Sequence, residues 1–271
     1  MKSIFKTFIL FFSNCMIFFN ISSCEKTNLG GQLTQTEYFA KLHTLEIQHA
    51  YFMTSLENNW DTLILPVGVK KDSILQNVNY RTYKIDLGHS KLCGDYIERR
   101  GRFSVEEFFV NGKIDSIVCQ FIPFDSFGVA VSTNFIFFEG YMGFKILNAT
   151  TYEVRSNLNM HFSSTLAVSL ISKSLVHRIL KSPVKKSFED GLEFTGNSEI
   201  RDNLGQFNLS SIYKNLKKGV DAPNFPISGQ IDTKSLDNNF ININFDAFNN
   251  LAYDKLAKGH QGNTEWIFDI Q

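Results

Sequence analysis

A predicted hairpin in the first half of the chain constrains the fold more than any other local sequence. Residues 102–110 and 113–121 are two runs rich in apolar side chains, and Asn111-Gly112 separates them. Asn-Gly between such runs favours a two-residue turn, because both residues tolerate the positive φ that the turn requires. The sequence therefore predicts two antiparallel strands here.

Period-2 alternation extends this pattern along the chain. Residues 158–170 place apolar side chains at every second position except Ser164, which predicts one strand or a pair of strands with one buried face. Residues 175–181 suit either a helix or a strand. Further strands are predicted at 62–69, 80–87, 133–138, 144–152, 191–200, 204–212, 227–231, 240–245 and 265–270. So many short strands separated by turns predict a mainly β fold, an antiparallel sandwich or barrel-like sheets.

One N-terminal helix precedes this β region in the prediction. Apolar residues recur at mostly helical spacing between positions 36 and 57, which indicates a helix there. The predicted organisation is a signal peptide at 1–23, a lipidated tether at 24–33, the helix segment at 34–57, and β regions at 58–172 and 173–271. The two β regions are also compatible with one continuous domain.

The first 24 residues predict export from the cytoplasm. Lys2 and Lys6 form a basic start, and residues 8–19 are almost wholly apolar. This order is the plan of a secretory signal peptide, and the apolar run is shorter than the roughly 20 residues that a membrane-spanning helix needs. The sequence therefore predicts removal of this segment.

The end of the signal resembles the lipobox of bacterial lipoproteins. Ile21-Ser22-Ser23-Cys24 has the aliphatic residue, the two small residues and the cysteine of that motif. The resemblance implies cleavage between Ser23 and Cys24, and attachment of lipid to the Cys24 thiol, with acyl chains such as palmitate anchoring the protein. A cleaved signal without lipid and an amino-terminal membrane anchor are the alternatives. The expected location is the bacterial cell envelope, at the outer membrane, facing either the periplasm or the cell surface.

Charge gives no case for nucleic acid. Removal of residues 1–23 takes away Lys2 and Lys6 and leaves 25 basic against 27 acidic residues, a net charge of −2. Nucleic-acid binding favours a clustered basic face, which this balance does not indicate. The expected partners are the membrane, through lipid on Cys24, and an envelope protein, glycan or lipid.

Two further cysteines remain in the predicted mature chain. Cys93 and Cys119 would lie in an exported protein, where disulfides persist. The sequence leaves two alternatives open, a Cys93–Cys119 disulfide or two buried thiols, because the geometry that a disulfide requires is not readable from spacing.

Two stretches are similar to each other and to a known group of proteins. Residues 83–88, followed by Cys93-Gly94-Asp95, share their pattern with residues 241–246, followed by Tyr253-Asp254. The pattern resembles Bacteroidetes-type cell-envelope lipoproteins without an assigned activity, over residues 80–271. In that group a cysteine is expected where Tyr253 stands and a glycine where Asp246 stands. The resemblance implies a class of protein and a location, and no reaction.

No catalytic motif is present in the sequence. The chain lacks a Gly-x-Ser-x-Gly elbow, a His-Glu-x-x-His helix, a phosphate-binding loop and zinc-type cysteine pairs, so no cofactor or metal is expected. Glu106 and Glu107 are adjacent on a predicted strand, where they point to opposite faces and do not flank one bond. The sequence favours a non-catalytic binding or structural module. The alternative is an envelope hydrolase whose site is not recognisable from sequence.

Overall fold

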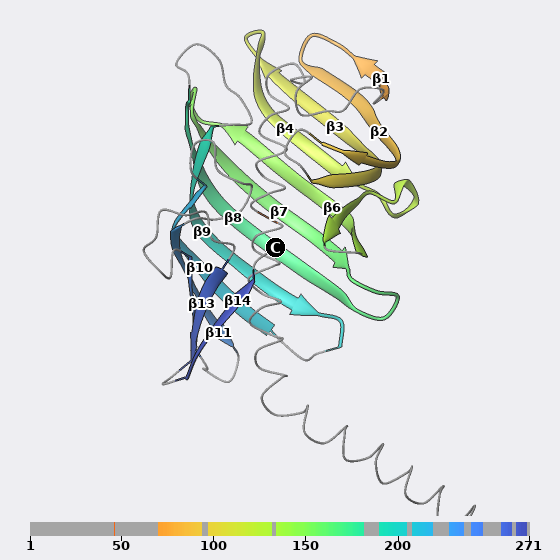
Figure 1. Cartoon of the computed structure of the whole chain (residues 1–271). Helices are drawn as coiled ribbons and strands as arrows, with labels where there is room; N and C mark the ends of the chain where they lie inside the picture. The colour runs from red at the N-terminus through yellow and green to blue at the C-terminus, as the bar shows by residue number, and fades with distance from the viewer. Residues whose placement is uncertain are drawn as a thin grey trace, which may run out of the picture.

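The computed structural model in Figure 1 describes the β region of the chain. The described residues are 46, 70–93, 97–131, 134–181, 190–204, 208–218, 228–235, 240–245, 256–261 and 264–269. The signal segment, the lipobox with Ser23 and Cys24, and the predicted strand at 62–69 lie outside these residues. Of the predicted helix, only Glu46 is described, and its backbone is α-helical.

The described residues from 70 onward form strands joined by turns. The strands are β1 Lys70–Gln76, β2 Tyr80–Leu92, β3 Glu98–Val110, β4 Lys113–Phe121, β5 Gly128–Val131, β6 Asn134–Ile146, β7 Thr151–His161, β8 Ala167–Ile179, β9 Gly191–Asp202, β10 Asn208–Lys218, β11 Ser228–Ser235, β12 Phe240–Phe245, β13 Leu256–Gln261 and β14 Thr264–Asp269. A single 3-10 turn, η2 Pro123–Asp125, lies between β4 and β5 within this part of the chain.

All described strands belong to one antiparallel sheet. Its order follows the chain from β1 to β14, except that β5 lies off this path and pairs with β3 and β6. Sequential antiparallel pairing is the expected result of short turns between neighbouring strands. The mainly β prediction is confirmed, and the described strands form a single sheet instead of the two sheets of a sandwich. Figure 1 shows that this sheet is strongly twisted.

The predicted hairpin is confirmed. Residues 98–110 and 113–121 form β3 and β4, and Val110 pairs with Lys113 across the turn. Asn111 and Gly112 have φ values of 51° and 74°, as a turn of this type requires. The predicted strand at 240–245 is β12.

The predicted break between residues 138 and 144 is wrong. β6 runs from Asn134 through Gly140 and Gly143 to Ile146 without interruption. Gly140 allows a neighbouring backbone to approach closely, since a Cβ there would lie 2.1 Å from the Asn157 carbonyl oxygen. Glycine therefore marks a close contact inside this strand, and not its end.

Other predicted elements take one of the forms that the sequence left open. Residues 158–170 are a strand pair, with β7 ending at His161 and β8 beginning at Ala167, so Ser164 lies in the turn. Residues 175–179 continue β8 as strand. The boundary proposed at 172 and 173 falls inside β8, which pairs along its length with β7 and β9. β1, β5 and β13 were not predicted.

Alternation gives the sheet a buried inner face and a more exposed outer face. The inner side chains of β8, for example, include Val168, Leu170 and Val176, all fully buried. Phe103, Phe121, Phe127 and Phe138 form the phenylalanine cluster on this face, with ring centroids 5.0 to 6.2 Å apart. Burial of such rings supplies much of the free energy of folding.

Two buried carboxylates on the sheet are paired with arginine. Glu107 accepts hydrogen bonds from Tyr83 Oη, 2.5 Å away, and from Arg81 Nε, 2.6 Å away. Arg178 donates to Asp190 over 2.7 Å, and both side chains are fully buried. Pairing is required because an isolated buried charge is strongly unfavourable.

Candidate functional site

The predicted site residues fall into two groups. Ser23 and Cys24 lie outside the described residues, whereas Cys93 and Cys119 are both buried and are not joined in a disulfide. Burial, and secondarily the neighbouring Glu107 carboxylate, raise the pKa of Cys119 far above its usual range. A thiol held in its protonated form is a poor nucleophile, so Cys119 is a packing residue.

Glu106 and Glu107 lie on opposite faces of β3. Glu106 accepts a hydrogen bond from Gln120 Nε2 over 3.0 Å on the outer face, while Glu107 is buried against Tyr83 and Arg81. The two carboxylates therefore do not act as a pair on one bond, as the alternation of the strand predicts.

A line of buried hydroxyl groups crosses the inner face. These side chains, here called the hydroxyl row, are Ser156, Ser172, Ser198, Ser211 and Thr233 on β7 to β11. Each is directly opposite the next in the strand register. The Ser211 and Thr233 hydroxyls are 2.9 Å apart. The row is a polar band across a face whose other buried side chains are mostly apolar.

Glu46 is bound to this row. Its carboxylate accepts hydrogen bonds from Ser172 Oγ and, over 2.6 Å, from Tyr213 Oη, and the side chain is buried. Burial, and then the Glu46 carboxylate, raise the pKa of Tyr213 well above its usual value. Hydrogen bonds of this kind stabilise a carboxylate that has been removed from water.

A glycine leaves room for this arrangement. Gly196 is opposite both Ser174 and Tyr213, and a Cβ at Gly196 would lie 2.7 Å from Ser174 Oγ. Ser174 Oγ and Ser156 Oγ are buried and have no hydrogen-bond partner among the described residues. Glycine at position 196 therefore permits the close approach of the strand that carries Ser174.

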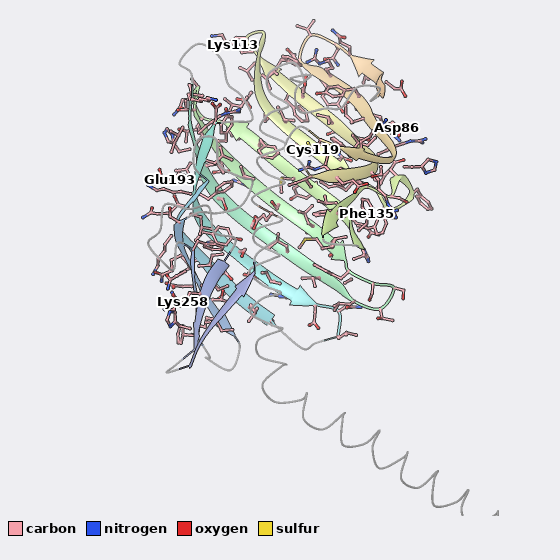
Figure 2. The ribbon with its side chains drawn as sticks, in the orientation of Figure 1. Asp86, Lys113, Cys119, Phe135, Glu193 and Lys258 are labelled. Carbon is pink, nitrogen blue, oxygen red and sulfur yellow. The ribbon has the colours of Figure 1, made fainter. Side chains whose placement is uncertain are left out.

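Described residues line two hollows of about 450 Å³ each, formed mainly by side chains of the outer face. The first, the phenylalanine hollow, lies beside the start of β6, where Figure 2 labels Phe135. Its lining residues are Pro123, Ser126, Phe135, Phe137, Phe138, Glu139, His161, Phe162, Ser163 and Ser164. His161 Nε2 lies 3.2 Å from a Glu139 carboxylate oxygen. This pair is the closest approach of a histidine and a carboxylate in the hollow.

Arg100 stacks on two of the rings that line the phenylalanine hollow. Its guanidinium carbon is 4.5 Å from the ring centroids of both Phe135 and Phe137. This stacking fixes the guanidinium and the two rings relative to each other. The wall of the hollow is therefore aromatic, with a cation stacked on its rings.

The second hollow lies over β10 to β13. We call this outer surface the amide face, and its outward side chains include Ser210, Ile212, Lys214, Gln230, Asp232, Lys234, Phe240, Asn242, Asn244, Lys258 and His260. In one row of the register, Ile212 is opposite Asp232, Asp232 is opposite Asn242, and Asn242 is opposite His260. Figure 2 shows Lys258 at this end of the molecule.

Hydrogen bonds connect the centre of the amide face. Asp232 accepts from Asn242 Nδ2 over 2.5 Å and from Gln230 Nε2, and it is paired with Lys214. Partial burial opposes ionisation, but these three donors together lower the pKa of Asp232. Asn244 Nδ2 donates to Asn242 Oδ1 over 2.8 Å. The amide groups are therefore held in fixed orientations.

Neither hollow contains a recognisable metal centre. Among the described residues, no group of three or more histidine, cysteine, aspartate or glutamate side chains is placed to bind a metal ion. The two arrangements suit non-covalent recognition by aromatic rings, amides and a few charges. Among the described residues that line the two hollows, Glu139 and His161 are a carboxylate and a histidine in direct contact, which gives them acid–base capacity as a pair.

Sequence reasoning found part of the amide face. The alternation in 240–245 already separates Asn242 and Asn244 from the buried side chains. Asp232 and Lys234 were missed, although Gln230, Asp232 and Lys234 alternate with buried Ile231 and Thr233. His260 had no signal, because β13 has no apolar alternation. Glu46 was missed because a single acidic residue in an apolar helical pattern gives no indication of its partners.

Comparison of the chain with protein-family models, with curated proteins and with solved structures finds no match in any of the three. Within the described residues, no helix has both the length and the apolar character needed to span a membrane.

Proposed function

We propose that this chain is a lipid-anchored protein of a bacterial cell envelope that binds a partner without catalysing a reaction. The anchor is proposed from the Ile21-Ser22-Ser23-Cys24 sequence, with cleavage after Ser23 and lipid on Cys24. Mass spectrometry of the mature amino terminus tests the anchor. An acylated Cys24 is expected, and an unmodified amino-terminal residue contradicts it.

The observation that carries the binding role is the amide face. It is an outward hollow whose polar groups hydrogen-bond to one another, beside exposed Ile212 and Phe240. Pockets that combine apolar walls with a few fixed polar groups are the usual form of ligand sites. Fixed groups lose little conformational entropy when a ligand binds.

Crosslinking in intact envelopes tests this role. Wild type and Cys24→Ala are crosslinked and purified, and a specific partner or glycan is expected with wild type. If Cys24→Ala retains the same partner, anchoring is incidental to recognition. If wild type captures nothing above a control lipoprotein, the binding role is wrong.

We further propose that the predicted helix at 34–57 is attached to the inner face of the sheet through Glu46. The support is the helical backbone at Glu46 and its bonds to Ser172 and Tyr213. The single twisted sheet favours the barrel-like alternative of the predicted architectures.

A hydrolase is the second candidate, and the Glu139–His161 pair favours it. The pair lies in a hollow with the hydroxyl groups of Ser126, Ser163 and Ser164. Ser163 Oγ already accepts hydrogen bonds from the backbone N–H groups of Thr165 and Leu166, so this hydroxyl stabilises the turn between β7 and β8. Hydrolysis of envelope glycans or esters that is abolished by His161→Ala, with folding retained, would favour the hydrolase over the binding module.

A further inference from the structure

Three neighbouring strands place two apolar groups and one cation around the second hollow. Ser210 is opposite Lys234, and Lys234 is opposite Phe240. Phe240 is 63% exposed and Ile212 is 55% exposed, although both are large apolar side chains. Exposed rings and aliphatic groups beside fixed polar groups are typical of a surface that is covered by a ligand.

Lys234 supplies a positive charge that has no carboxylate partner among the described residues. Its ammonium nitrogen lies 5.6 Å from the Phe240 ring centroid, and it makes no ion pair with a described residue. The Asp232 carboxylate is neutralised by its pairing with Lys214, and it is bound by two amides. The hollow therefore offers one cation and a carboxylate that is already satisfied.

The amides add directional hydrogen bonding. Asn242 Nδ2 donates to Asp232, and Asn242 Oδ1 accepts from Asn244, so the position of the Asn242 side chain is fixed. Ser210 and His260 line the same hollow. Such groups suit a ligand with many hydroxyls, since each hydroxyl both donates and accepts.

We propose that the amide face binds an acidic glycan, a chain of sugars bearing carboxylate or phosphate groups. The apolar C–H face of a sugar ring packs on Phe240 and Ile212, its hydroxyls bond to Asn242 and Ser210, and its anionic group pairs with Lys234. The proposal rests on the binding role proposed above and names the class of its ligand.

Charge and composition favour a glycan over a lipid headgroup. A single lysine contributes only about 1 kcal/mol at an anionic membrane surface, so membrane binding needs several of them. The hollow instead combines one cation with amides and a ring, and its volume of about 450 Å³ is within the range of small-ligand sites. Membrane binding is a distinct outcome of the test.

The purified full-length protein is tested against matched acidic and neutral glycans. The probes are polygalacturonate and a phosphomannan, with the methyl ester of polygalacturonate and unmodified mannan as neutral counterparts. Affinity is measured by titration calorimetry in low salt. At least one acidic probe is expected to bind about ten-fold more tightly than its neutral counterpart. The proposal is overturned if neither acidic probe binds, or if both bind no more tightly than their neutral counterparts.

Three variants locate the site. Lys234→Gln is expected to remove about ten-fold of the affinity for the acidic probe, the range of a lost charge-assisted bond, and to leave the neutral counterpart unchanged. Phe240→Ala is expected to weaken binding of both forms. Lys113→Gln is the control, because Figure 2 shows Lys113 at the far end of the molecule from Lys258. If Lys113→Gln matches Lys234→Gln, the effect is non-specific and the proposal is wrong.

Vesicles and crosslinking separate the other outcomes. Phosphatidylglycerol vesicles that bind with dependence on Lys234, without glycan binding, assign the face to a membrane and overturn the glycan. If Lys234→Gln still captures the envelope partner while no acidic probe binds, the binding role stands and the glycan class is wrong. Lys234 and Phe240 are exposed, so both variants are expected to fold, and circular dichroism checks this.

Discussion

The inner face of the sheet holds four phenylalanine rings between β3 and β6, and a row of five hydroxyls from β7 to β11. The phenylalanine cluster is packed by ring contacts that have little directional requirement. The hydroxyl row requires hydrogen-bond partners, and Ser172 finds one in Glu46, which is 126 residues away in the chain and also accepts a hydrogen bond from Tyr213.

This difference assigns separate roles to the two regions: the rings stabilise the fold, and the hydroxyls determine where the Glu46 segment attaches. Burial of the rings away from water stabilises the folded state, whichever apolar surface covers them. Buried hydroxyls are unfavourable until they are paired, so they favour one arrangement of the chain over others. We expect the phenylalanine cluster to dominate the free energy of unfolding, and the hydroxyl row to determine where the Glu46 segment attaches.

Truncation of a ring gives the largest expected effect. Phe127 is fully buried, with centroid distances of 5.0 Å to Phe121 and 5.2 Å to Phe103. Phe127→Ala is expected to lower the free energy of unfolding by about 3–5 kcal/mol, measured by denaturant titration. Phe124→Ala is the matched control, since Phe124 is 96% exposed and should change stability by less than about 0.5 kcal/mol. Similar losses in both variants would show that the cluster is not the stabilising core.

Alkaline pH distinguishes the two regions next. The unfolded Cys119 thiol ionises near pH 8.5, whereas the folded thiol stays protonated because its pKa is raised. The unfolded state then binds fewer protons, so stability falls as pH rises, by up to about 1.4 kcal/mol per pH unit. The stability advantage of wild type over Cys119→Ala should therefore shrink above pH 8.5.

Tyr213 provides the comparison for this titration. Its folded pKa is also raised, but an unfolded tyrosine ionises only near pH 10. The advantage of wild type over Tyr213→Phe should stay constant to about pH 10 and shrink above it. Unfolding titrations at half-unit steps from pH 7 to pH 11 measure both differences. If the stability differences of both variants from wild type changed over the same pH range, Cys119 and Tyr213 would not titrate separately.

Much of the fold was predictable, because alternation and turn chemistry act locally. β3, β4 and β12 follow directly from apolar periodicity and from Asn111-Gly112. β13 was not predictable, since Leu256–Gln261 has no alternating apolar side chains and forms a strand through pairing with β12. Gly140 led to a wrong strand boundary for a similar reason. It is needed for the close approach of the neighbouring strand β7, and it does not end β6.

The candidate site was less predictable than the fold. Ile212, Asp232, Asn242 and His260 come from four strands, and only the register brings them into one row. Glu46 and Tyr213 are 167 residues apart in the chain. A single sequence shows which side chains face outward, but it does not show which distant ones meet.

Removal of one hydroxyl donor tests the attachment of Glu46. Tyr213→Phe leaves the buried carboxylate with Ser172 as a donor and takes away the 2.6 Å bond from Tyr213 Oη. The expected loss is about 1–3 kcal/mol in the free energy of unfolding. Tyr141→Phe is the control, because the Tyr141 side chain is exposed on the outer face. An unchanged Tyr213→Phe would mean that Glu46 does not depend on this hydroxyl.

The smallest expected effect on stability comes from the hydroxyl row, where substitution of two of its serines should act in opposite directions. Ser156 Oγ is buried and has no hydrogen-bond partner among the described residues, whereas Ser172 Oγ donates to Glu46. Ser156→Ala removes an unsatisfied group, so it is expected to be neutral or to stabilise by up to about 1 kcal/mol. Ser172→Ala removes a donor to a buried carboxylate and is expected to destabilise by about 1 kcal/mol or more. Equal losses in the two variants would show that Ser156 also has a partner, and that the whole row, beyond its centre, takes part in attachment.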